Sequence, residues 1–303
     1  MGRGDKYTSR WRAGSLALTA AVMAAVPTGA TALGVGQASG TAPVPAQSLG
    51  SSVATCRPGT GVVANGFEAP AFGPGDNAAA VARISSRRVG ARKVATDAFN
   101  FGGQAGDIVS LAYCARLGKA IRVNSNRVLV PPGSEGSSVA SCPRRSRALG
   151  GGFEAPGFSK ANGPEIITLT SMRAGKRSWM VAGFNLPPED SGQGGGSRAA
   201  GQPGVLVAYV YCAKSHPKLV STSRQAEVPT GSLTTVDAAC PHGTRALGGG
   251  FDGNLQPVGQ DISAAGAIIS ERVAGGRAWT ISALSISDTT PAIATAYAYC
   301  LRP

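Results

Sequence analysis

The sequence predicts an all-β fold made of three homologous antiparallel β units, and three observations support this. A six-residue stretch occurs three times in nearly the same form, as VVANGF at Val62–Phe67, ALGGGF at Ala148–Phe153 and ALGGGF at Ala246–Phe251. Apolar residues after the N-terminal segment alternate with a period of two, which is typical of strands rather than helices. The composition, with 43 glycines and only 15% charged residues, suits a β protein with many turns.

The first 32 residues have the layout of a secretory signal peptide. Four basic side chains precede an uncharged run, residues 13–32, and Ala30-Thr31-Ala32 offers small residues at the −3 and −1 positions of a cleavage site. Ala38 is a second candidate for the cleavage position. No later stretch approaches the roughly 20 apolar residues that span a bilayer. We therefore expect a secreted protein, extracellular or associated with the cell wall, that keeps no membrane span after signal cleavage.

The repeat defines the expected domain boundaries. When the three copies are aligned on the motif Phe, the first cysteine of each lies 11 residues before it, and each copy closes with an aromatic residue and a second cysteine. A Val-Pro pair precedes each first cysteine at a constant distance. We predict a flexible N-terminal segment at residues 33–43 and repeats at 44–129, 130–227 and 228–303. Ser191–Gly204 has the composition of a flexible surface loop and accounts for the longer second repeat.

The spacing between repeats bears on their arrangement. Each second cysteine is followed 28 residues later by the first cysteine of the next repeat, so these connections belong to the repeating unit. This favours close packing, but it leaves open both tandem modules and a pseudo-threefold body. Period-two patterns rich in β-branched residues predict four to six short strands in each repeat: Ser51–Thr55, Ile166–Met172, Trp179–Phe184, Val205–Tyr211, Ile293–Tyr299 and their counterparts.

The glycine motif itself is interpreted as a bulge or turn that starts a strand. Asn replaces Gly at one position, and Asn is the non-Gly residue that best tolerates a left-handed backbone. We therefore predict positive φ at Asn65, Gly151 and Gly249, and a site that tolerates a Cβ at Ala64, Gly150 and Gly248. A phosphate-binding loop is the alternative, but no helix signal follows the motif to supply the pull of a helix N-terminus.

Six cysteines placed equivalently in a secreted chain predict three disulfides. The repeat favours the pairs Cys56–Cys114, Cys142–Cys212 and Cys240–Cys300, while swapped pairing between neighbouring repeats stays open. A zinc site is not expected, because the chain has no CxxC spacing and only two histidines, His216 and His242. We expect neither a metal nor another cofactor.

The charge is strongly positive. The formal net charge is +13, and removal of residues 1–32, with four basic side chains and one acidic one, leaves 25 − 15 = +10. Such a chain favours polyanionic surroundings such as wall polymers, acidic lipid headgroups or nucleic acid, and the same charge also serves solubility. Nucleic acid is not expected as the partner, because the basic residues are spread along the sequence rather than clustered with aromatic ones.

A recurring Ser-x-Arg supplies the candidate ligand-binding residues. These are Ser86 and Arg88, Ser171 and Arg173, and, in a third copy aligned with one extra residue before its Trp, Ser270 and Arg272. Arg beside a hydroxyl can hold a carboxylate, sulfate or phosphate, and three such sites would give avidity for a repetitive polymer. The alternatives are an exposed strand face or pairing of each Arg with the acid after the motif Phe, which is Glu68, Glu154 or Asp252.

The aromatic and acidic residues give weaker signals. Trp179 and Trp279 align with Val94, which favours a role in the core over sugar stacking. Catalysis is not expected, since a nucleophile needs a positioned base and only two histidines are present. Glu189, Asp190 and Asp261 are available as carboxylates, but no spacing marks a pair. We predict a non-catalytic binding protein for an anionic cell-wall polymer or a glycan; the alternatives are a coat or adhesion protein and, third, a secreted hydrolase.

CPHGTRALGGGF (Cys240–Phe251), followed by Ser, Trp and the closing AYAYC, resembles repeats of poorly characterised secreted proteins of actinobacteria. CPRRSRALGGGF (Cys142–Phe153) and CRPGTGVVANGF (Cys56–Phe67) depart from that pattern. The resemblance covers about 250 residues and implies no particular activity. The three cysteine-bearing repeats also look like those of vitelline membrane outer layer proteins, which would imply a three-sided β-prism and a role in an extracellular coat.

Overall fold

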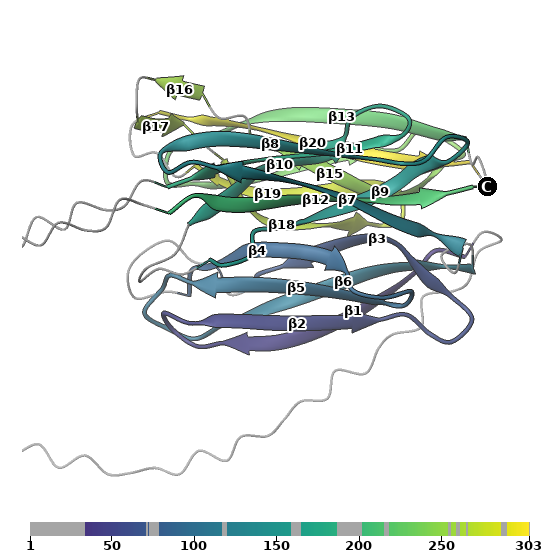
Figure 1. Cartoon of the computed structure of the whole chain (residues 1–303), viewed down its shortest axis with the longest axis horizontal. Coiled ribbons are helices and arrows are strands. Elements are labelled where there is room, and N and C mark those ends of the chain that lie inside the picture. The colour runs from purple at the N-terminus through teal and green to yellow at the C-terminus, as the bar shows by residue number, and fades with distance from the viewer. Residues whose placement is uncertain are drawn as a thin grey trace, which may run out of the picture.

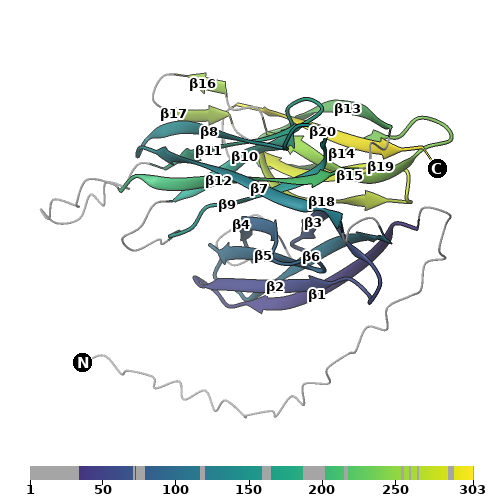
Figure 2. The ribbon, with the colours of Figure 1, turned by 45° about the vertical axis from the view of Figure 1, so that its right-hand side comes forward.

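The computed structural model describes residues 34–70, 72, 79–116, 120–158, 165–186, 202–214, 218–253, 256–258, 261–264, 266–285 and 290–302. These residues form an all-β body of three six-stranded antiparallel sheets (Figures 1 and 2). Within them, no helix has the length and apolarity that crossing a bilayer requires. The predicted signal peptide and residues 191–201 of the predicted surface loop lie outside the described residues.

Each repeat contributes six strands in the same order, and we call the three sets unit 1, unit 2 and unit 3. Unit 1 contains β1 (Gly36–Val44), β2 (Leu49–Thr55), β3 (Gly61–Glu68), β4 (Val81–Arg88), β5 (Lys93–Asn100) and β6 (Gly106–Ala115). Unit 2 contains β7 (Arg122–Val130), β8 (Ser134–Ser141), β9 (Arg147–Glu154), β10 (Ile166–Arg173), β11 (Ser178–Asn185) and β12 (Gly204–Ala213). Unit 3 contains β13 (Leu219–Val228), β14 (Leu233–Ala239), β15 (Arg245–Asp252), β18 (Gly266–Ala274), β19 (Ala278–Ser285) and β20 (Ala292–Leu301), and adds the hairpin of β16 (Gln256–Val258) and β17 (Asp261–Ala264).

Every sheet combines strands of two units. The strand orders are β1-β6-β3-β18-β19-β14, β2-β5-β4-β9-β12-β7 and β13-β20-β15-β10-β11-β8. The third strand of each unit therefore pairs with the fourth strand of a neighbour, as β3 with β18, β9 with β4 and β15 with β10. This cyclic exchange closes the units around a pseudo-threefold axis, so the structure is the pseudo-threefold body and not a row of tandem modules.

The start of unit 1 differs from the prediction. Residues 36–43, expected to be flexible, belong to β1, which pairs with β6 along its whole length from Gly36 opposite Cys114 to Val44 opposite Gly106. Its small and polar residues carry little strand propensity. Pairing with the buried β6 orders the strand in spite of that, and β1 is the counterpart of β7 and β13.

Tyrosines join the units across their shared sheets. The last Tyr before each second cysteine is fully buried, and its hydroxyl accepts a hydrogen bond from a backbone N–H of a neighbouring unit's fourth strand. The oxygen–nitrogen distance is 2.7 Å for each of the three pairs: Tyr113 with Val273, Tyr211 with Arg88 and Tyr299 with Arg173. Burial raises the pKa of all three hydroxyls well above the ordinary value. These bonds satisfy backbone donors that the partly paired junction strands leave free.

The three motif phenylalanines surround one buried arginine near the pseudo-threefold axis. The guanidinium carbon of Arg83 lies 3.8 Å from the ring centre of Phe67, 4.3 Å from that of Phe153 and 4.8 Å from that of Phe251. Glu271 of unit 3 forms an ion pair with it. Burial lowers the pKa of Arg83 to about 10, opposed by Glu271, and it raises the pKa of Glu271. Units 2 and 3 have Thr168 and Ile268 at the register position of Arg83, so this pair breaks the symmetry.

The glycine motif contains the predicted bulge. The pairing register shifts between Val62 and Ala64 in unit 1, and the ladders of β9 and β15 shift at the matching place. The predicted positive φ is wrong: none of Asn65, Gly151 and Gly249 has a left-handed backbone.

Space explains the Gly-to-Asn exchange. A Cβ built on Gly151 would lie 2.3 Å from Cγ of Trp179, and one on Gly249 would lie 2.1 Å from Cγ of Trp279, far inside normal contact. Unit 1 has the small Val94 in place of Trp, which leaves room for Asn65. Asn65 Nδ2 donates to Ser86 Oγ (2.7 Å), as Trp179 Nε1 donates to the equivalent Ser171 Oγ (3.0 Å). Asn with Val thus replaces Gly with Trp in both volume and hydrogen bonding, and the predicted core role of both tryptophans is confirmed by their burial.

Candidate polyanion-binding surface

The structure uses three of the four predicted Ser-x-Arg residues of units 1 and 2 internally, and the fourth, Arg173, is partly exposed. Ser86 and Ser171 are buried and hold the Asn and Trp side chains described above. Arg88 is buried and donates to the carbonyl oxygens of Gly90 (2.7 Å), Ala91 (3.0 Å) and Ile121 (3.3 Å). Burial lowers its pKa, opposed by Tyr211. These contacts give Arg88 a role in closing the hairpin after β4, and Ser86 presents no surface to a ligand.

The third copy has a different register from the predicted one. Ser86 lies opposite Phe153 and Ser171 opposite Phe251, but the residue opposite Phe67 is Glu271. Ser270 and Arg272 therefore correspond to Ser85 and Arg87, one position earlier than predicted, and the extra residue before Trp279 is not needed. The alignment was misled because Glu occupies the position at which the other two copies have Ser. The six predicted residues consequently do not form three equivalent sites.

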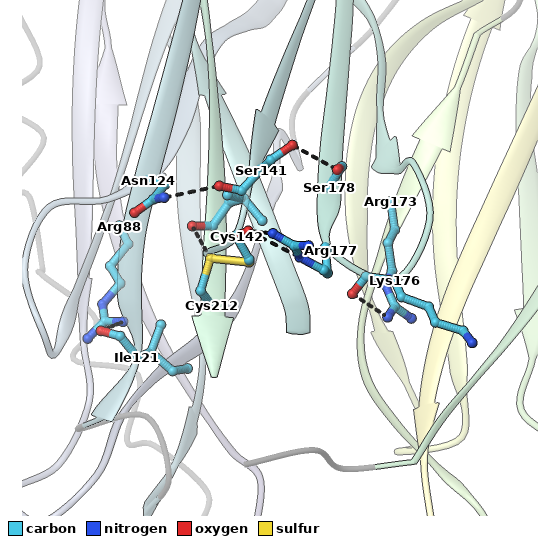
Figure 3. The surroundings of a disulfide bond; sticks show 11 residues. Arg88, Ile121, Asn124, Ser141, Cys142, Arg173, Lys176, Arg177, Ser178 and Cys212 are labelled. Atoms are coloured by element: carbon cyan, nitrogen blue, oxygen red, sulfur yellow. Dashed lines mark hydrogen bonds between the residues drawn. A yellow bond between two sulfur atoms is a disulfide. The ribbon is translucent and has the colours of Figure 1, made fainter. Parts of the chain in front are cut away.

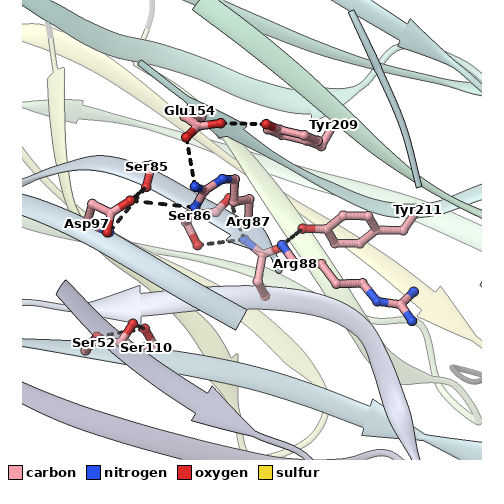
Figure 4. Close-up of polar contacts among 11 residues, drawn as sticks. Ser52, Ser85, Ser86, Arg87, Arg88, Asp97, Ser110, Glu154, Tyr209 and Tyr211 are labelled. Atoms are coloured by element: carbon pink, nitrogen blue, oxygen red, sulfur yellow. Dashed lines mark hydrogen bonds and ion pairs between the residues drawn. The ribbon is translucent and has the colours of Figure 1, made fainter. Parts of the chain in front are cut away.

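Arg87 and Arg272 instead belong to polar networks at the unit junctions. Arg87 pairs with Glu154 of unit 2 at 2.8 Å and lies 3.7 Å from Asp97 (Figure 4). Tyr209 donates to the same Glu154 at 2.5 Å, and burial together with that carboxylate raises the pKa of Tyr209 to about 12. At the next junction the half-exposed Arg272 lies 3.2 Å from Glu68. Pairing of an Arg with the acid after the motif Phe is thus realised, but from a neighbouring unit.

The three disulfides are paired as predicted, one in each unit: Cys56–Cys114, Cys142–Cys212 and Cys240–Cys300. Each lies where the second strand ends and the sixth strand ends. Around it are the turn after the first cysteine, the hairpin turn between the fourth and fifth strands, and the segment after the sixth strand. We call the surface formed by these nine segments the disulfide end.

Topology places all three sets of turns at the same end of the body. The fourth strand of one unit pairs antiparallel with the third strand of another, so β4 ends toward the same end of the body at which β9 begins. The same holds for β10 with β15 and for β18 with β3. The C-terminus lies at this end, on the right in Figure 1.

Exposed cations gather on the disulfide end. Nine arginines and four lysines of its turns and segments are exposed: Arg57, Lys93, Arg116, Arg122, Arg144, Arg145, Lys176, Arg177, Lys214, Lys218, Arg245, Arg277 and Arg302. Among the described residues no acidic side chain lies there. The described acids lie at the other end of the strands or within them: Glu68, Asp97, Asp107, Glu135, Glu154, Glu165, Glu227, Asp237, Asp252, Asp261 and Glu271. The body is therefore polarised, with a cationic end and an acid-bearing opposite end.

Internal hydrogen bonds hold part of this surface in place. Arg92 and Arg177, at equivalent positions, bind the carbonyl oxygens of Cys56 (2.6 and 2.9 Å) and Cys142 (2.5 and 3.2 Å). The backbone N–H of Cys142 in turn donates to the Arg177 carbonyl at 2.7 Å. Figure 3 shows Arg177 and Lys176 beside the Cys142–Cys212 bridge. These hydrogen bonds thus fix the cationic hairpins to the backbone of the disulfide-bonded cysteines.

Sequence reasoning missed this surface because its members are far apart along the chain. The available signal was positional: the basic residues of this surface fall within the eight positions after a cysteine, or on or next to the Gly-containing turn between the fourth and fifth strands, whereas none of the described acids does. Once the repeat is aligned, these positions are equivalent from unit to unit. Folding then brings together what the linear sequence spreads out.

The remaining chemical candidates are scattered. His242 lies exposed in the turn after Cys240, and Asp261 belongs to β17. His216, Glu189 and Asp190 lie outside the described residues. In the part of the chain that the structure describes, no group of three or more His, Cys, Asp or Glu side chains is placed to hold a metal ion.

Comparison with known proteins adds no family to this picture. No protein-family model and no curated protein matches the chain.

Proposed function

We propose that this protein is an exported, non-catalytic binding protein that holds an anionic polymer of the cell envelope or extracellular space against its disulfide end. The observation that carries the proposal is the separation of charge, with thirteen exposed cations at this end and none of the described acids. The signal-peptide layout of residues 1–32 and the three disulfides support export into an oxidising compartment.

The chemistry of the surface suits a chain of negative charges. A field of one sign over a broad face attracts a polyanion, and each neutralised charge on the polymer releases a counterion. Nine of the thirteen exposed cations are arginines, whose planar guanidinium binds phosphate, sulfate or carboxylate through two parallel hydrogen bonds. Cations spread over three units also offer several contacts to one long ligand, which raises avidity.

The same surface argues against recognition by stacking. Among the described residues the exposed large apolar side chains are aliphatic, namely Leu49, Val53, Val89, Val123, Leu129, Val139 and Leu233. Proteins that hold single-stranded nucleic acid or sugar rings commonly stack aromatic side chains against them. The proposal is accordingly a ligand read by its charge, and nucleic acid is the less favoured polyanion.

Co-sedimentation with purified cell walls at two salt concentrations tests the proposal. The full chain is produced and exported in an oxidising host, and binding is compared at about 50 mM and about 500 mM salt, because a site that neutralises about four phosphates loses several hundred-fold in affinity over that range. Binding that disappears at the higher salt supports the proposal. Binding that survives high salt, or no binding at either concentration, contradicts it.

The charge separation also favours a second candidate, a structural protein that assembles with copies of itself. Exposed acids Asp107, Glu135 and Glu227 lie at the end opposite the cations. Contact of unlike ends is head-to-tail, and such contacts give open chains unless they close into a ring. Sedimentation velocity at low salt tests this: growth of the particle with protein concentration supports self-assembly, and a constant monomer excludes it.

A further inference from the structure

The three units provide an internal comparison, because equivalent positions of the disulfide end carry different residues. In the turn after the first cysteine, unit 1 has Arg57-Pro-Gly-Thr, unit 2 has Pro143-Arg-Arg-Ser-Arg and unit 3 has Pro241-His-Gly-Thr-Arg. Two exposed arginines therefore occupy the turn of unit 2 alone. Because the fold is the same in all three units, a residue that only one unit has at such a position is a candidate for a contact with the ligand.

Arg145 is the clearest of these differences. Its φ is 63°, in the left-handed region, whereas the equivalent Gly59 and Gly243 have φ values of 90° and 74°. A residue with a Cβ is disfavoured there by roughly 1 kcal/mol relative to Gly. Arg145 is exposed, so packing does not compensate for this strain. A strained, exposed arginine where both counterparts have Gly indicates selection for the side chain rather than for the turn.

A second difference lies at the base of the same turn. Arg147 begins β9 and Arg173 ends β10, and unit 2 alone has arginine at both positions: unit 1 has Gly61 with Arg88, and unit 3 has Arg245 with Val273. A hydrogen bond joins β9 to the hairpin turn that follows β10, since the N–H of Ala148 donates to the Lys176 carbonyl at 3.1 Å. This arrangement brings two guanidinium groups of like charge to adjoining strand ends.

The surroundings of Arg173 show that this pair is not neutralised by the described residues. Arg173 donates to the Lys176 carbonyl at 3.1 Å, but its Nε is buried without a hydrogen-bond partner among them. Burial lowers the pKa of Arg173, Tyr299 opposes this, and the positive charge of Arg147 lowers it further. Its counterpart Arg88, in contrast, binds three backbone carbonyls. An anion placed here would relieve the repulsion between the two guanidinium groups.

We propose that Arg147 and Arg173, together with Arg145 on the adjoining turn, bind a phosphate group of a phosphodiester polymer, and that unit 2 is the primary contact of the disulfide end. Phosphate is favoured over carboxylate because its oxygens are arranged tetrahedrally around phosphorus, so guanidinium groups from different strands can approach it from several directions, whereas a carboxylate presents its two oxygens in one plane. The inference rests on the proposed function, since it names the ligand group for that surface. Lys176 on the neighbouring hairpin would contact a flanking phosphate.

Arg145→Gly is the sharpest variant, because it installs the residue that both counterparts have at this φ and so leaves the fold intact. Arg57→Gln is the comparison variant in unit 1, because it removes one exposed cation from the corresponding turn, and Arg224→Gln, an exposed arginine of β13 outside the disulfide end, is the control. Arg173→Val, with the residue of unit 3, is a second independent variant. Binding of each exported variant to poly(glycerol phosphate) is measured by titration calorimetry at about 50 mM salt, with polygalacturonate and single-stranded DNA as comparison polymers. Thermal unfolding of each variant confirms its fold.

We expect Arg145→Gly and Arg173→Val each to weaken binding of poly(glycerol phosphate) about tenfold, as loss of one charge-assisted contact predicts. Arg57→Gln should weaken it by a smaller factor of about two to three, and Arg224→Gln should leave it unchanged. Equal losses for Arg57→Gln and Arg145→Gly would overturn the assignment to unit 2 while leaving the proposed function standing. If polygalacturonate, a polymer of carboxylates, binds as tightly as poly(glycerol phosphate), the preference for phosphodiesters is wrong. If single-stranded DNA binds as tightly, the preference for a wall-type phosphodiester is wrong. If the wild type binds none of these polymers, the proposed function itself is wrong.

Discussion

Exchange of the Gly–Trp pair of unit 2 for the Asn–Val pair of unit 1 tests how the glycine motif works. The perturbation is Gly151→Asn with Trp179→Val, compared with each single change. The two positions share one volume and one hydrogen bond to Ser171. In unit 1 Asn65 and Val94 together fill the equivalent space, and Asn65 binds the equivalent Ser86.

The magnitudes follow from the contacts. Gly151→Asn alone places a Cβ 2.3 Å from the Trp179 ring, where ordinary contact begins near 3.4 Å, so the ring must move by more than 1 Å. Such overpacking costs about 3 kcal/mol or more. Trp179→Val alone opens a cavity and leaves Ser171 without its indole donor, at a cost of about 3 kcal/mol. The double variant removes the clash with the ring, fills part of the cavity and restores a donor, but its Cβ still lies 2.5 Å from the backbone carbonyl oxygen of Tyr209, so the strand must shift slightly and we expect a loss of about 2 kcal/mol.

Urea unfolding with the disulfides intact measures the four free energies of unfolding. The expected outcome is that the double variant is more stable than either single variant, which gives a coupling energy of several kcal/mol. If the two single losses add within about 0.5 kcal/mol, the two positions are independent and the shared-volume explanation is wrong. Gly249 with Trp279 offers a second test of the shared volume alone, because Glu271 there occupies the position of the serine and Trp279 Nε1 has no hydrogen-bond partner among the described residues.

Three further predictions concern the junctions, the axis and the N-terminus. Tyr211→Phe leaves the buried N–H of Arg88 unpaired and should cost about 1 to 3 kcal/mol in urea unfolding. Because the pKa of Tyr211 is raised in the folded state, only the unfolded state loses the proton above pH 10, so stability falls with rising pH, and Tyr211→Phe should reduce this fall by about 1.4 kcal/mol per pH unit; equal slopes would contradict the assignment. Arg83→Ala leaves the Glu271 carboxylate buried and uncompensated, so we expect a loss of about 3 to 5 kcal/mol, whereas Arg83→Met with Glu271→Leu should be nearly as stable as the wild type. N-terminal mass spectrometry of the exported protein should find cleavage after Ala32, which keeps the whole of β1, and cleavage within β1 would show that its first residues are dispensable.

The sequence predicted the all-β class, the three units and the disulfide pairs, because these depend on local spacing that recurs. Strand predictions such as Trp179–Phe184 were correct for the same reason: β-branched and aromatic residues alternate there. The exchange of strands between units was not predictable, since pairing of β4 with β9 is a contact between distant segments whose faces are apolar in either arrangement. The flexible interpretation of residues 36–43 failed because β1 is ordered by its partner and not by its own composition.

The glycine motif shows why a local rule failed. Asn in place of Gly suggested left-handed backbone, which is the commonest reason for that exchange. The actual constraint at Gly151 is the ring of Trp179, 28 residues further along the chain, and no single copy of the motif shows it. The signal was present only as correlated change between units, with Asn65 accompanied by Val94 and both glycines accompanied by Trp.

The same logic of comparison between units separates structural arginines from candidate ligand-binding ones. Arg88 binds two carbonyls of its own turn and the carbonyl of Ile121, and Arg92 binds the carbonyl of a cysteine, so their charges already serve the fold. Arg145 has the opposite profile, because it is exposed and sits in a backbone conformation that two of the three units assign to Gly. If the Arg145 side chain had no role, the strain of its positive φ would favour Gly at this position, as in units 1 and 3. Unit 2 has Arg at this position, next to the pair Arg147 and Arg173 that no other unit has, and this is the reason to look for the ligand there first.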